Sequence, residues 1–336
     1  MRALVLMGPG DLRMMDMPKP VPGPGEVLVK TRAATVCTSD LIDIASNPFG
    51  IELPMIIGHE GAGVIEAVGE NVIGFSVGDE ITAHPVIPCK QCVSCKRGLF
   101  HLCDQMDHLG VYRPGVFAEY FTIRHDRIRK KPEGLSFAES TLMEPICVCL
   151  EAIERGNVQK GSNVLVLGDG PFGVAIAKLA FAKKPKRVIL VGRHQYRLDQ
   201  VPNAITIHEK QTDDVVGDIW KATDGEGVDS AILAVGTARA MDICIDSLRS
   251  RGTVAVFSGV HEKAPVDLFK LHVKELQIHG SCNDMEMLDE AIEALTDETL
   301  NLKGLITHEL PFDKWEEAIQ TAKNGKDSAL KVSMVL

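Results

Sequence analysis

The sequence has no excess of positive charge. Its 336 residues include 36 Lys and Arg against 46 Asp and Glu, which gives a formal net charge of -10 at pH 7. A nucleic-acid-binding protein needs a basic face, so this balance argues against that class of partner. It does not argue against a phosphorylated small molecule, because a few local basic residues can bind one. We therefore expect a small-molecule ligand and no nucleic acid.

Long apolar runs are missing as well. No stretch approaches the roughly 20 apolar residues that span a bilayer. The apolar start at residues 1–7 meets Gly8-Pro9-Gly10 at once, unlike a signal peptide. Nine cysteines, an odd number, accompany this pattern. Together these features predict a cytoplasmic protein with reduced thiols and no membrane partner.

Four of the cysteines lie in one short loop with the spacing C-x2-C-x2-C-x7-C. They are Cys89, Cys92, Cys95 and Cys103. Thiolates at such spacings can complete a tetrahedral zinc site with bonds of about 2.3 Å. The alternative is free or disulfide-bonded cysteines, which a reducing compartment disfavours. Because four thiolates leave no position for a substrate, we expect a structural zinc here.

Length and pattern predict two domains. The first part of the chain is rich in Gly, Pro and short β-type runs, which predicts an irregular, mostly β domain; examples are residues 27–30, 63–68 and 119–123. Beyond residue 150, apolar strands alternate with helical segments, which predicts a parallel sheet covered on both faces. The expected strands are 163–167, 187–191, 230–235, 253–257 and 276–279. The tail should add helices at 285–295 and 315–322 and a strand at 330–335.

A glycine motif, G-x-G-x-x-G, follows the first of these apolar strands and opens a predicted helix at 172–182. In this context it is typical of a dinucleotide site, whose pyrophosphate lies at the helix N-terminus. The alternative is an ordinary strand–turn–helix connection. The expected contacts are Gly168, Gly170, Pro171, Phe172 and Gly173.

The residues at the end of the second strand should determine whether NAD or NADP binds. An NAD site usually places Asp or Glu there to bind the ribose 2′-hydroxyl. This chain has Gly192, Arg193 and His194, with no carboxylate until Asp199. Glycine leaves space for a 2′-phosphate and arginine can bind it through paired N–H groups. We therefore expect NADP(H) in preference to NAD(H); the alternative is a solvated Arg193 and NAD without its usual partner.

Three residues from distant parts of the chain form a candidate catalytic metal set. They are Cys37, His59 and Glu144. A thiolate, an imidazole and a carboxylate can bind zinc and leave a fourth position open for substrate. From these residues alone the set is only suggestive, since a single histidine is more often structural.

Several motifs occur together in one order along the whole chain. They are residues 37–40 (CTSD), residues 58–63 (GHEGAG) with Gly69 and Val72, the four-cysteine loop, Glu144-Pro145, and Gly168 to Gly173. In this combination the chain resembles the zinc-dependent medium-chain alcohol and polyol dehydrogenases, in particular the sorbitol-dehydrogenase-like branch. The resemblance implies an α/β fold, with a Rossmann domain at 151–285 inserted in a GroES-like domain made from 1–150 and 286–336.

The resemblance also implies roles for single residues. Cys37, His59 and Glu144 match the catalytic zinc ligands, and Glu60 matches a carboxylate behind the zinc that binds it transiently. Ser39 matches the hydroxyl that contacts the substrate oxygen. The nicotinamide is expected between the domains, near Phe257, Ser258, Gly259 and Val260, and Val235 and Gly236 are further expected cofactor contacts. Two zinc ions per chain and a homodimer or homotetramer are further expectations.

One position departs from the family pattern. Many relatives carry a proton-relaying histidine where this chain has Ile42, so the proton must leave through the cofactor ribose, water or Asp43. The expected reaction is hydride transfer between NADP(H) and a secondary alcohol or its ketone, most simply a polyol, sugar or sugar derivative. Alternatives are a threonine-type amino-alcohol dehydrogenase and a non-catalytic NADP-binding redox sensor or scaffold. The other cysteines should be small buried hydrophobes: Cys147, Cys149, Cys244 and Cys282.

Overall fold

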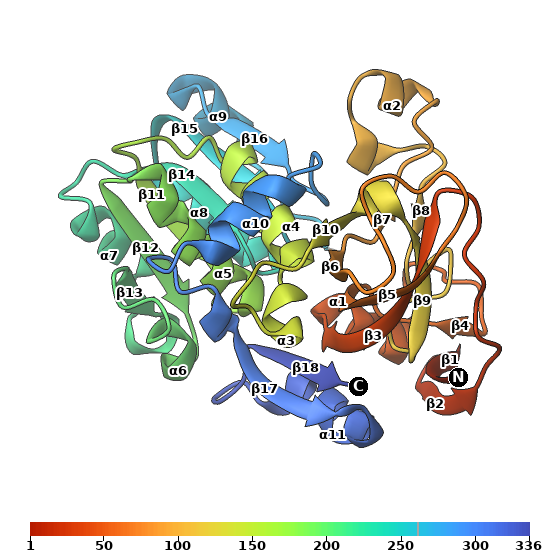
Figure 1. Cartoon of the computed structure of the whole chain (residues 1–336). Coiled ribbons are helices and arrows are strands. Elements are labelled where there is room, and N and C mark those ends of the chain that lie inside the picture. The colour runs from red at the N-terminus through yellow and green to blue at the C-terminus, as the bar shows by residue number, and fades with distance from the viewer. Residues whose placement is uncertain (261) are drawn as a thin grey trace.

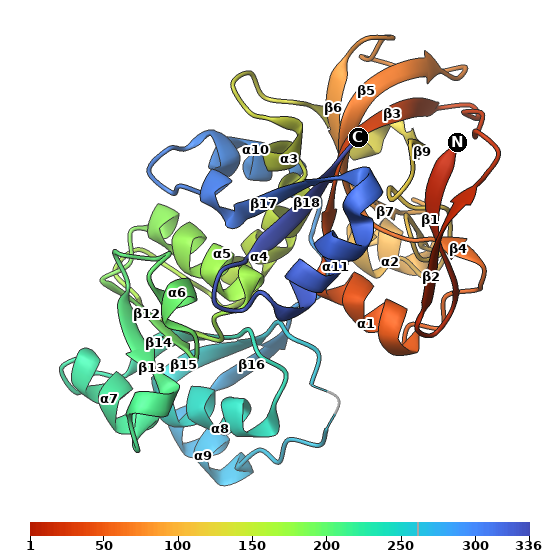
Figure 2. The same cartoon turned by 90° about the horizontal axis from the view of Figure 1, so that it is seen from below.

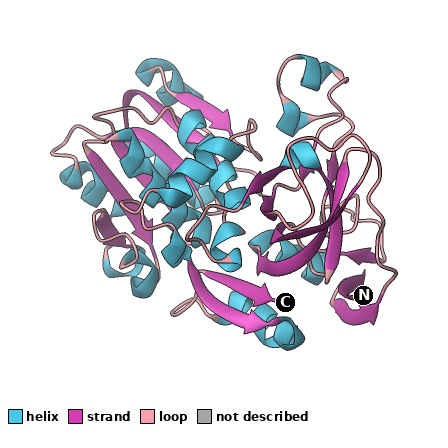
Figure 3. Cartoon of the chain, in the orientation of Figure 1, coloured by secondary structure: helices cyan, strands magenta, loops and turns pink. Residues whose placement is uncertain are grey.

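The computed structural model describes residues 1–260 and 262–336. Figure 1 shows two bodies, one dominated by strands of the first part of the chain and one in which helices flank a central sheet. Figure 3 shows the contrast, with mainly strands in the first body and both strands and helices in the second. In the described part of the chain, no helix has the length and apolar character that crossing a bilayer requires.

The first body contains short strands and few helices. Its elements are β1 (Arg2–Gly8), β2 (Asp11–Asp16), β3 (Glu26–Val36), α1 (Thr38–Ser46), β4 (Met55–Ile56), β5 (Glu60–Val68), β6 (Glu80–Ala83), β7 (Val86–Ile87), α2 (Val93–Lys96), β8 (Asp107–His108), β9 (Tyr120–Arg124), β10 (Ile128–Lys130) and α3 (Phe137–Ser140). The main sheet runs β10-β6-β5-β3-β18-β17, and β9 also pairs with β3. An irregular β domain was predicted here, and its strands enclose a core that includes Phe117 and Phe121.

Both ends of the chain build this sheet. Strands β17 (Ile306–Pro311) and β18 (Lys331–Val335) come from the C-terminal part, and β18 pairs antiparallel with β3, Val332 lying opposite Val36. Helix α11 (Trp315–Asn324) connects these two strands and packs beside them (Figure 2). The GroES-like part of the fold prediction is therefore confirmed, while the boundaries at residues 150 and 285 stay a prediction.

The second body is a six-stranded parallel sheet. In spatial order its strands are β13 (Ile205–His208), β12 (Arg187–Gly192), β11 (Asn163–Leu167), β14 (Val228–Leu233), β15 (Leu248–Val256) and β16 (Gln277–Gly280). This is the 3-2-1-4-5-6 order of a dinucleotide-binding sheet. The uninterrupted apolar run of β11 is buried throughout, as expected for a strand covered on both faces. The predicted doubly wound domain is confirmed.

Helices cover this sheet on both sides. They are α4 (Met143–Arg155), α5 (Pro171–Ala180), α6 (Gln195–Leu198), α7 (Val215–Ala222), α8 (Ala238–Ser247), α9 (Leu268–Lys274) and α10 (Leu288–Thr296). Glu144 lies in the first turn of α4. Pro145 explains the position, since proline is tolerated only where a helix N–H needs no partner.

Candidate active site and metal centres

The turn between β3 and α1 positions the first candidate ligand. Strand β3 ends at Val36 and α1 begins at Thr38, so Cys37 is the N-cap residue of the helix and is buried. His59 lies directly before β5 and follows Gly58, whose φ is +91°. A Cβ on Gly58 would lie 2.3 Å from the Phe117 ring. Glycine is therefore required beside the histidine, for both its backbone conformation and the space it leaves.

The structure brings Cys37, His59 and Glu60 together, with one ligand atom of each within 4.8 Å of the others. Asp40 orients two of them: its Oδ2 accepts the N–H of Cys37 at 2.8 Å, and its Oδ1 is 3.1 Å from Nδ1 of His59. A carboxylate on one imidazole nitrogen fixes the ring and leaves the other nitrogen for a metal. Sequence reasoning missed this role of Asp40, although its position in the first turn of α1 is that of a capping box.

Two buried carboxylates complete the centre. Glu60 is fully buried, and Oε2 of Glu60 and Oε2 of Glu144 have no hydrogen-bond partner in the described structure. Burial raises the pKa of Glu144 to about 7. Unpartnered buried oxygens are costly, and a bound cation would satisfy them. The donor set of thiolate, imidazole and carboxylate fits zinc. Glu144, however, lies outside the group that meets the 4.8 Å spacing.

Lys331 connects this centre to the cofactor-binding body. It comes from β18, is buried, and forms an ion pair with Glu60. Its Nζ lies 5.1 Å from the ring centroid of Phe172, in the first turn of α5. No local sequence signal marks Lys331, because it reaches the site from the last strand of the chain.

Helix α1 carries the candidate proton groups. Ser39 is in its first turn, two residues after Cys37, and is partly exposed. Asp43 lies four residues further along, so the two share one face of the helix. Asp43 is buried, and its Oδ1 has no hydrogen-bond partner. Burial, with a contribution from the charge of Asp40, raises the pKa of Asp43 to about 6. Ile42 is exposed at 42%.

The four-cysteine loop forms a separate cluster around α2. The sulfurs of Cys89 and Cys95 are 4.0 Å apart, and those of Cys92 and Cys103 are 3.9 Å apart. A tetrahedron with metal–sulfur bonds of about 2.3 Å has sulfurs about 3.8 Å apart, so the spacing fits zinc. Backbone N–H groups also donate to the sulfurs, as from Cys92 to Cys89 at 3.3 Å. The N–H of Gln91 lowers the pKa of Cys89 to about 6, which favours the thiolate.

The prediction that the remaining four cysteines are buried holds for three of them. Cys147, Cys149 and Cys244 are buried, as predicted. Cys282 is exposed, so the prediction of a buried hydrophobe was wrong there. The reason is that β16 ends at Gly280 and leaves Cys282 in the connection to α10.

The glycine motif has the geometry that a phosphate-binding turn needs. Gly168 has φ +124°, and a Cβ on Gly173 would lie 1.9 Å from the carbonyl oxygen of Gly168. A Cβ on Gly170, by contrast, would meet no atom within 4 Å. Gly170 is the N-cap of α5 and Pro171 its first residue. The open space thus lies at the helix N-terminus, where a pyrophosphate fits.

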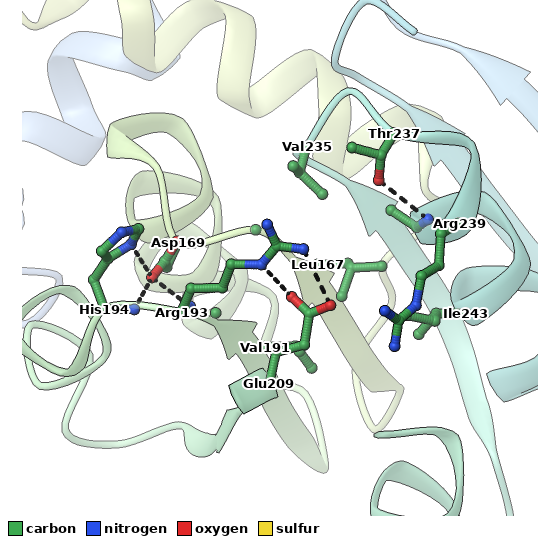
Figure 4. Close-up of a pocket in the computed structure, with 13 residues that line it drawn as sticks. Leu167, Asp169, Val191, Arg193, His194, Glu209, Val235, Thr237, Arg239 and Ile243 are labelled. Atoms are coloured by element: carbon green, nitrogen blue, oxygen red, sulfur yellow. Dashed lines mark hydrogen bonds and ion pairs between the residues drawn. The ribbon is translucent and has the colours of Figure 1, made fainter. Parts of the chain in front are cut away.

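Beside this turn lies a cleft of about 170 Å³ at the carboxyl ends of the parallel strands. Its lining is Leu167, Gly168, Asp169, Val191, Gly192, Arg193, His194, Glu209, Val235, Thr237, Arg239, Ala240 and Ile243 (Figure 4). Ligands of such sheets bind at this edge. Among the predicted contacts, Gly168, Gly192, Arg193, His194 and Val235 line the cleft.

The other predicted cofactor residues lie around the cleft. A Cβ on Gly236 would lie 2.4 Å from the carbonyl oxygen of Gly259, so these two backbones run close together. The N–H of Ser258 donates to the carbonyl of Leu233. Sequence reasoning missed Asp169, Glu209, Thr237 and Arg239, although the strand order, once known, brings them to the same edge.

Charged groups meet in the cleft. Oδ2 of Asp169 accepts the N–H groups of Arg193 at 2.8 Å and His194 at 2.7 Å, which fixes the loop after β12. Arg193 donates to both carboxylate oxygens of Glu209, at 2.7 and 3.2 Å. These hydrogen bonds from Arg193 lower the pKa of Glu209, and the charge of Arg239 adds to the effect.

Comparison with known proteins agrees with this geometry. Residues 23–133 match the alcohol dehydrogenase GroES-like domain, and residues 170–297 match the zinc-binding dehydrogenase family. Sorbitol dehydrogenase of Bombyx mori is 30% identical over 98% of this chain and 97% of that protein. L-threonine 3-dehydrogenase of Pyrococcus horikoshii is 32% identical over 97% of this chain and 96% of that protein.

Solved structures agree as well. An alcohol dehydrogenase from E. coli CFT073, in complex with NADH, matches with a TM-score of 0.92 and 26% identity, over 100% of this chain and 99% of that one. This similarity along the whole length covers both bodies of the molecule. The chain therefore belongs to the medium-chain dehydrogenase/reductase family of alcohol and polyol dehydrogenases and is an oxidoreductase.

Proposed function

We propose that this enzyme transfers a hydride between NADP(H) and a secondary alcohol or its ketone, with the substrate held at a zinc ion. The observation that carries the proposal is the meeting of Cys37, His59 and Glu60 within 4.8 Å, next to buried carboxylate oxygens without partners. Lys331 links this group to α5, the helix that begins within the dinucleotide motif. The metal group and the cofactor helix are thus neighbours.

In this proposal Cys37, His59 and Glu144 hold the catalytic zinc, and Glu60, which forms an ion pair with Lys331, serves as a further carboxylate. When bound, the zinc supplies Lewis acidity and the cofactor supplies or accepts the hydride. Asp40 holds the His59 ring in one orientation. The second zinc belongs to the four-cysteine loop and stabilises it.

The chain's own residues move the proton. Ser39 is proposed to hydrogen-bond the substrate oxygen and pass its proton on. Asp43 is the proposed next group, because it is a buried carboxyl on the same face of α1 and its pKa of about 6 lies near neutrality. This assignment replaces the histidine that relatives carry at the place of Ile42.

The cofactor preference rests on the end of β12. Residues 191–194 include no carboxylate, and Arg193 lines the cleft with half of its side chain exposed. Arg239 supplies a second cation on the cleft wall. We infer a preference for NADP(H), with the nicotinamide near Ser258 and Gly259. Steady-state kcat/KM for NADPH and NADH tests it, and a clear preference for NADH contradicts it.

The substrate class is proposed from the relatives. Both sorbitol and threonine carry a hydroxyl on a secondary carbon beside another polar group, and the relatives named for them cover nearly the whole chain. We propose a polyol, sugar or sugar derivative, with a threonine-type amino alcohol as the second candidate. An NADP⁺-coupled screen over polyols, sugars, sugar acids and amino alcohols tests this. Absence of turnover on the whole panel would favour a non-catalytic NADP-binding sensor or scaffold.

A homodimer or homotetramer is also proposed. Strand β16 is the last strand of the parallel sheet, with one edge unpaired in the described structure. Such an edge is a template for pairing with another chain. Light scattering coupled to size exclusion measures the mass directly, and a monomer at working concentration contradicts this proposal.

A further inference from the structure

The cleft proposed for the cofactor ribose contains an acid beside its arginine. Glu209 follows β13 directly and receives two hydrogen bonds from Arg193, at 2.7 and 3.2 Å (Figure 4). The Glu209 side chain is 16% exposed and that of Arg193 is 50% exposed. One edge of the guanidinium is therefore already bound by the protein. A 2′-phosphate would need N–H groups of the same guanidinium.

The two carboxylates of the cleft have different surroundings. Asp169 is held by backbone N–H groups of the loop after β12, so it has a structural role. Glu209 has Arg193 as the only hydrogen-bond partner of its carboxylate among residues 1–260 and 262–336. It fixes no loop through that group. A carboxylate placed against the only arginine at the end of β12 is better explained by an effect on what that arginine binds.

Arg239 offers the acid a second partner. It lines the same cleft from the start of α8, is exposed, and has no side-chain hydrogen bond within the described residues. Its charge contributes to the lowered pKa of Glu209, which means that it acts on this carboxylate. When Arg193 turns to a phosphate, Glu209 still has a second cation in the same cleft, so this partly buried carboxylate does not remain unpaired.

We propose that Glu209 is a specificity-determining residue that competes with the cofactor 2′-phosphate for Arg193. NADP(H) binds by taking Arg193 from Glu209, which then pairs with Arg239, whereas NAD(H) leaves the Arg193–Glu209 pair in place. Glu209 thereby moderates the preference for NADP(H) that Arg193 alone would produce. The proposal rests on the proposed function in one respect, namely that the adenosine ribose lies at the end of β12.

The test compares Glu209→Gln with the wild type. Glutamine keeps the size of the side chain and removes its charge. Dissociation constants are measured by calorimetry for NADP⁺, NAD⁺, and the fragments 2′,5′-ADP and 5′-AMP, so no turnover is needed. Breaking a partly exposed ion pair and removing the repulsion should tighten NADP⁺ and 2′,5′-ADP on the order of tenfold. NAD⁺ and 5′-AMP should stay within about twofold of the wild type.

Two matched variants control the test. Glu275→Gln removes the acid of an exposed pair with Arg251 at 2.7 Å, remote in its contacts from the cleft, and should change neither dissociation constant. Arg239→Gln should weaken NADP⁺ while sparing NAD⁺, because Glu209 then loses its second partner. Equal tightening of NADP⁺ by Glu209→Gln and Glu275→Gln would overturn the proposal, since it would indicate a general effect of net charge.

Two other results would also overturn it. An unchanged NADP⁺ affinity in Glu209→Gln means that the acid does not compete. A selective loss of NAD⁺ affinity means that Glu209 accepts the ribose 2′-hydroxyl instead. A wild type that prefers NADH, on the other hand, contradicts only the proposed NADP(H) preference. The inference about Glu209 then stands if the variant still shifts the NADP⁺ to NAD⁺ affinity ratio toward NADP⁺.

Discussion

The two metal-binding regions of this chain are assembled in opposite ways. The cysteine loop takes all its donors from residues 89–103, with sulfurs 3.9–4.0 Å apart and backbone N–H groups turned toward them. The centre at Cys37 takes its residues from the turn between β3 and α1, from the start of β5, and from α4 and β18, which only the complete fold brings together. A site closed by one loop stabilises that loop, whereas a site gathered from both chain ends is available for a substrate.

The chemistry of the donor groups also distinguishes a structural site from a catalytic one. Four thiolates saturate a tetrahedral zinc, but a thiolate, an imidazole and a carboxylate leave a position open. Buried carboxylate oxygens without partners occur at the second centre, and Asp43, whose pKa is raised, lies on helix α1 beside it. The predictions below separate the two regions, beginning with the largest expected effect.

Loss of a metal-binding side chain at the Cys37 and His59 centre should abolish turnover and leave the fold intact. Cys37→Ser removes the thiolate but keeps the N-cap position of α1. We expect no measurable hydride transfer and an unchanged dissociation constant for NADPH, because the dinucleotide turn lies on another element. The matched control is Cys282→Ser, an exposed cysteine that belongs to neither cluster. Full activity of Cys37→Ser would remove the catalytic assignment.

Loss of a ligand in the cysteine loop should act on stability first. Cys95→Ser leaves only three thiolates to bind the metal. Because metal binding contributes to the folding free energy of the loop, weaker binding lowers its stability. We expect one zinc fewer per chain and a lower Tm, while the remaining folded enzyme retains NADPH binding. Thermal unfolding and metal analysis of the same preparation measure both. A Tm equal to that of Cys282→Ser would show that the loop needs no metal.

Removing the proposed proton group should slow the reaction without stopping it. Ser39→Ala deletes the hydroxyl in the first turn of α1 and leaves the metal ligands in place. General acid–base groups contribute about 10²–10⁴-fold, so kcat should fall by about 10². KM and the zinc content should stay close to the wild type. An unchanged kcat would assign Ser39 to structure.

The buried acid of α1 should make stability depend on pH. The pKa of Asp43 is raised from 3.8 to about 6, so the folded state disfavours its ionised form. The free-energy cost of ionising Asp43 in the folded protein is absent below about pH 4 and is complete above about pH 7. Asp43→Asn should therefore be more stable than the wild type at pH 8, by at most about 3 kcal/mol. Both proteins should unfold alike near pH 4.

Chemical denaturation at the two pH values measures this difference. A gap between variant and wild type that is the same at both would mean that Asp43 is not the titrating group. The same variant, assayed for kcat, sharpens the comparison further, because a proton route through Asp43 predicts slower turnover in a more stable protein.

Local patterns carried most of what could be predicted from the sequence. The strand at 163–167 and the turn from Gly168 to Gly173 follow from apolar runs and glycine spacing, which depend on neighbours in sequence. The cysteine loop is local in the same sense. These features were placed correctly because their conformation is determined within a few residues.

The contacts that were missed or wrongly predicted from the sequence join residues that lie far apart along the chain. Lys331 reaches Glu60 from the last strand, and Glu209 reaches Arg193 from the neighbouring strand, so neither contact has a sequence signature. Cys282 was expected to be buried because its neighbours looked apolar, but the end of β16 at Gly280 exposes it. Such contacts follow from strand order and chain reversal, which a single sequence does not specify.

The most direct test of the difference between the two regions is a crystal structure of the purified enzyme with anomalous diffraction data collected on both sides of the zinc absorption edge. We predict two zinc peaks per chain. One should be surrounded by the four sulfurs of residues 89–103, and the other should contact Cys37, His59 and a carboxylate while leaving a position free of protein. A single zinc peak in the cysteine loop, with none at Cys37 and His59, would contradict the assignment of the reaction to those two residues.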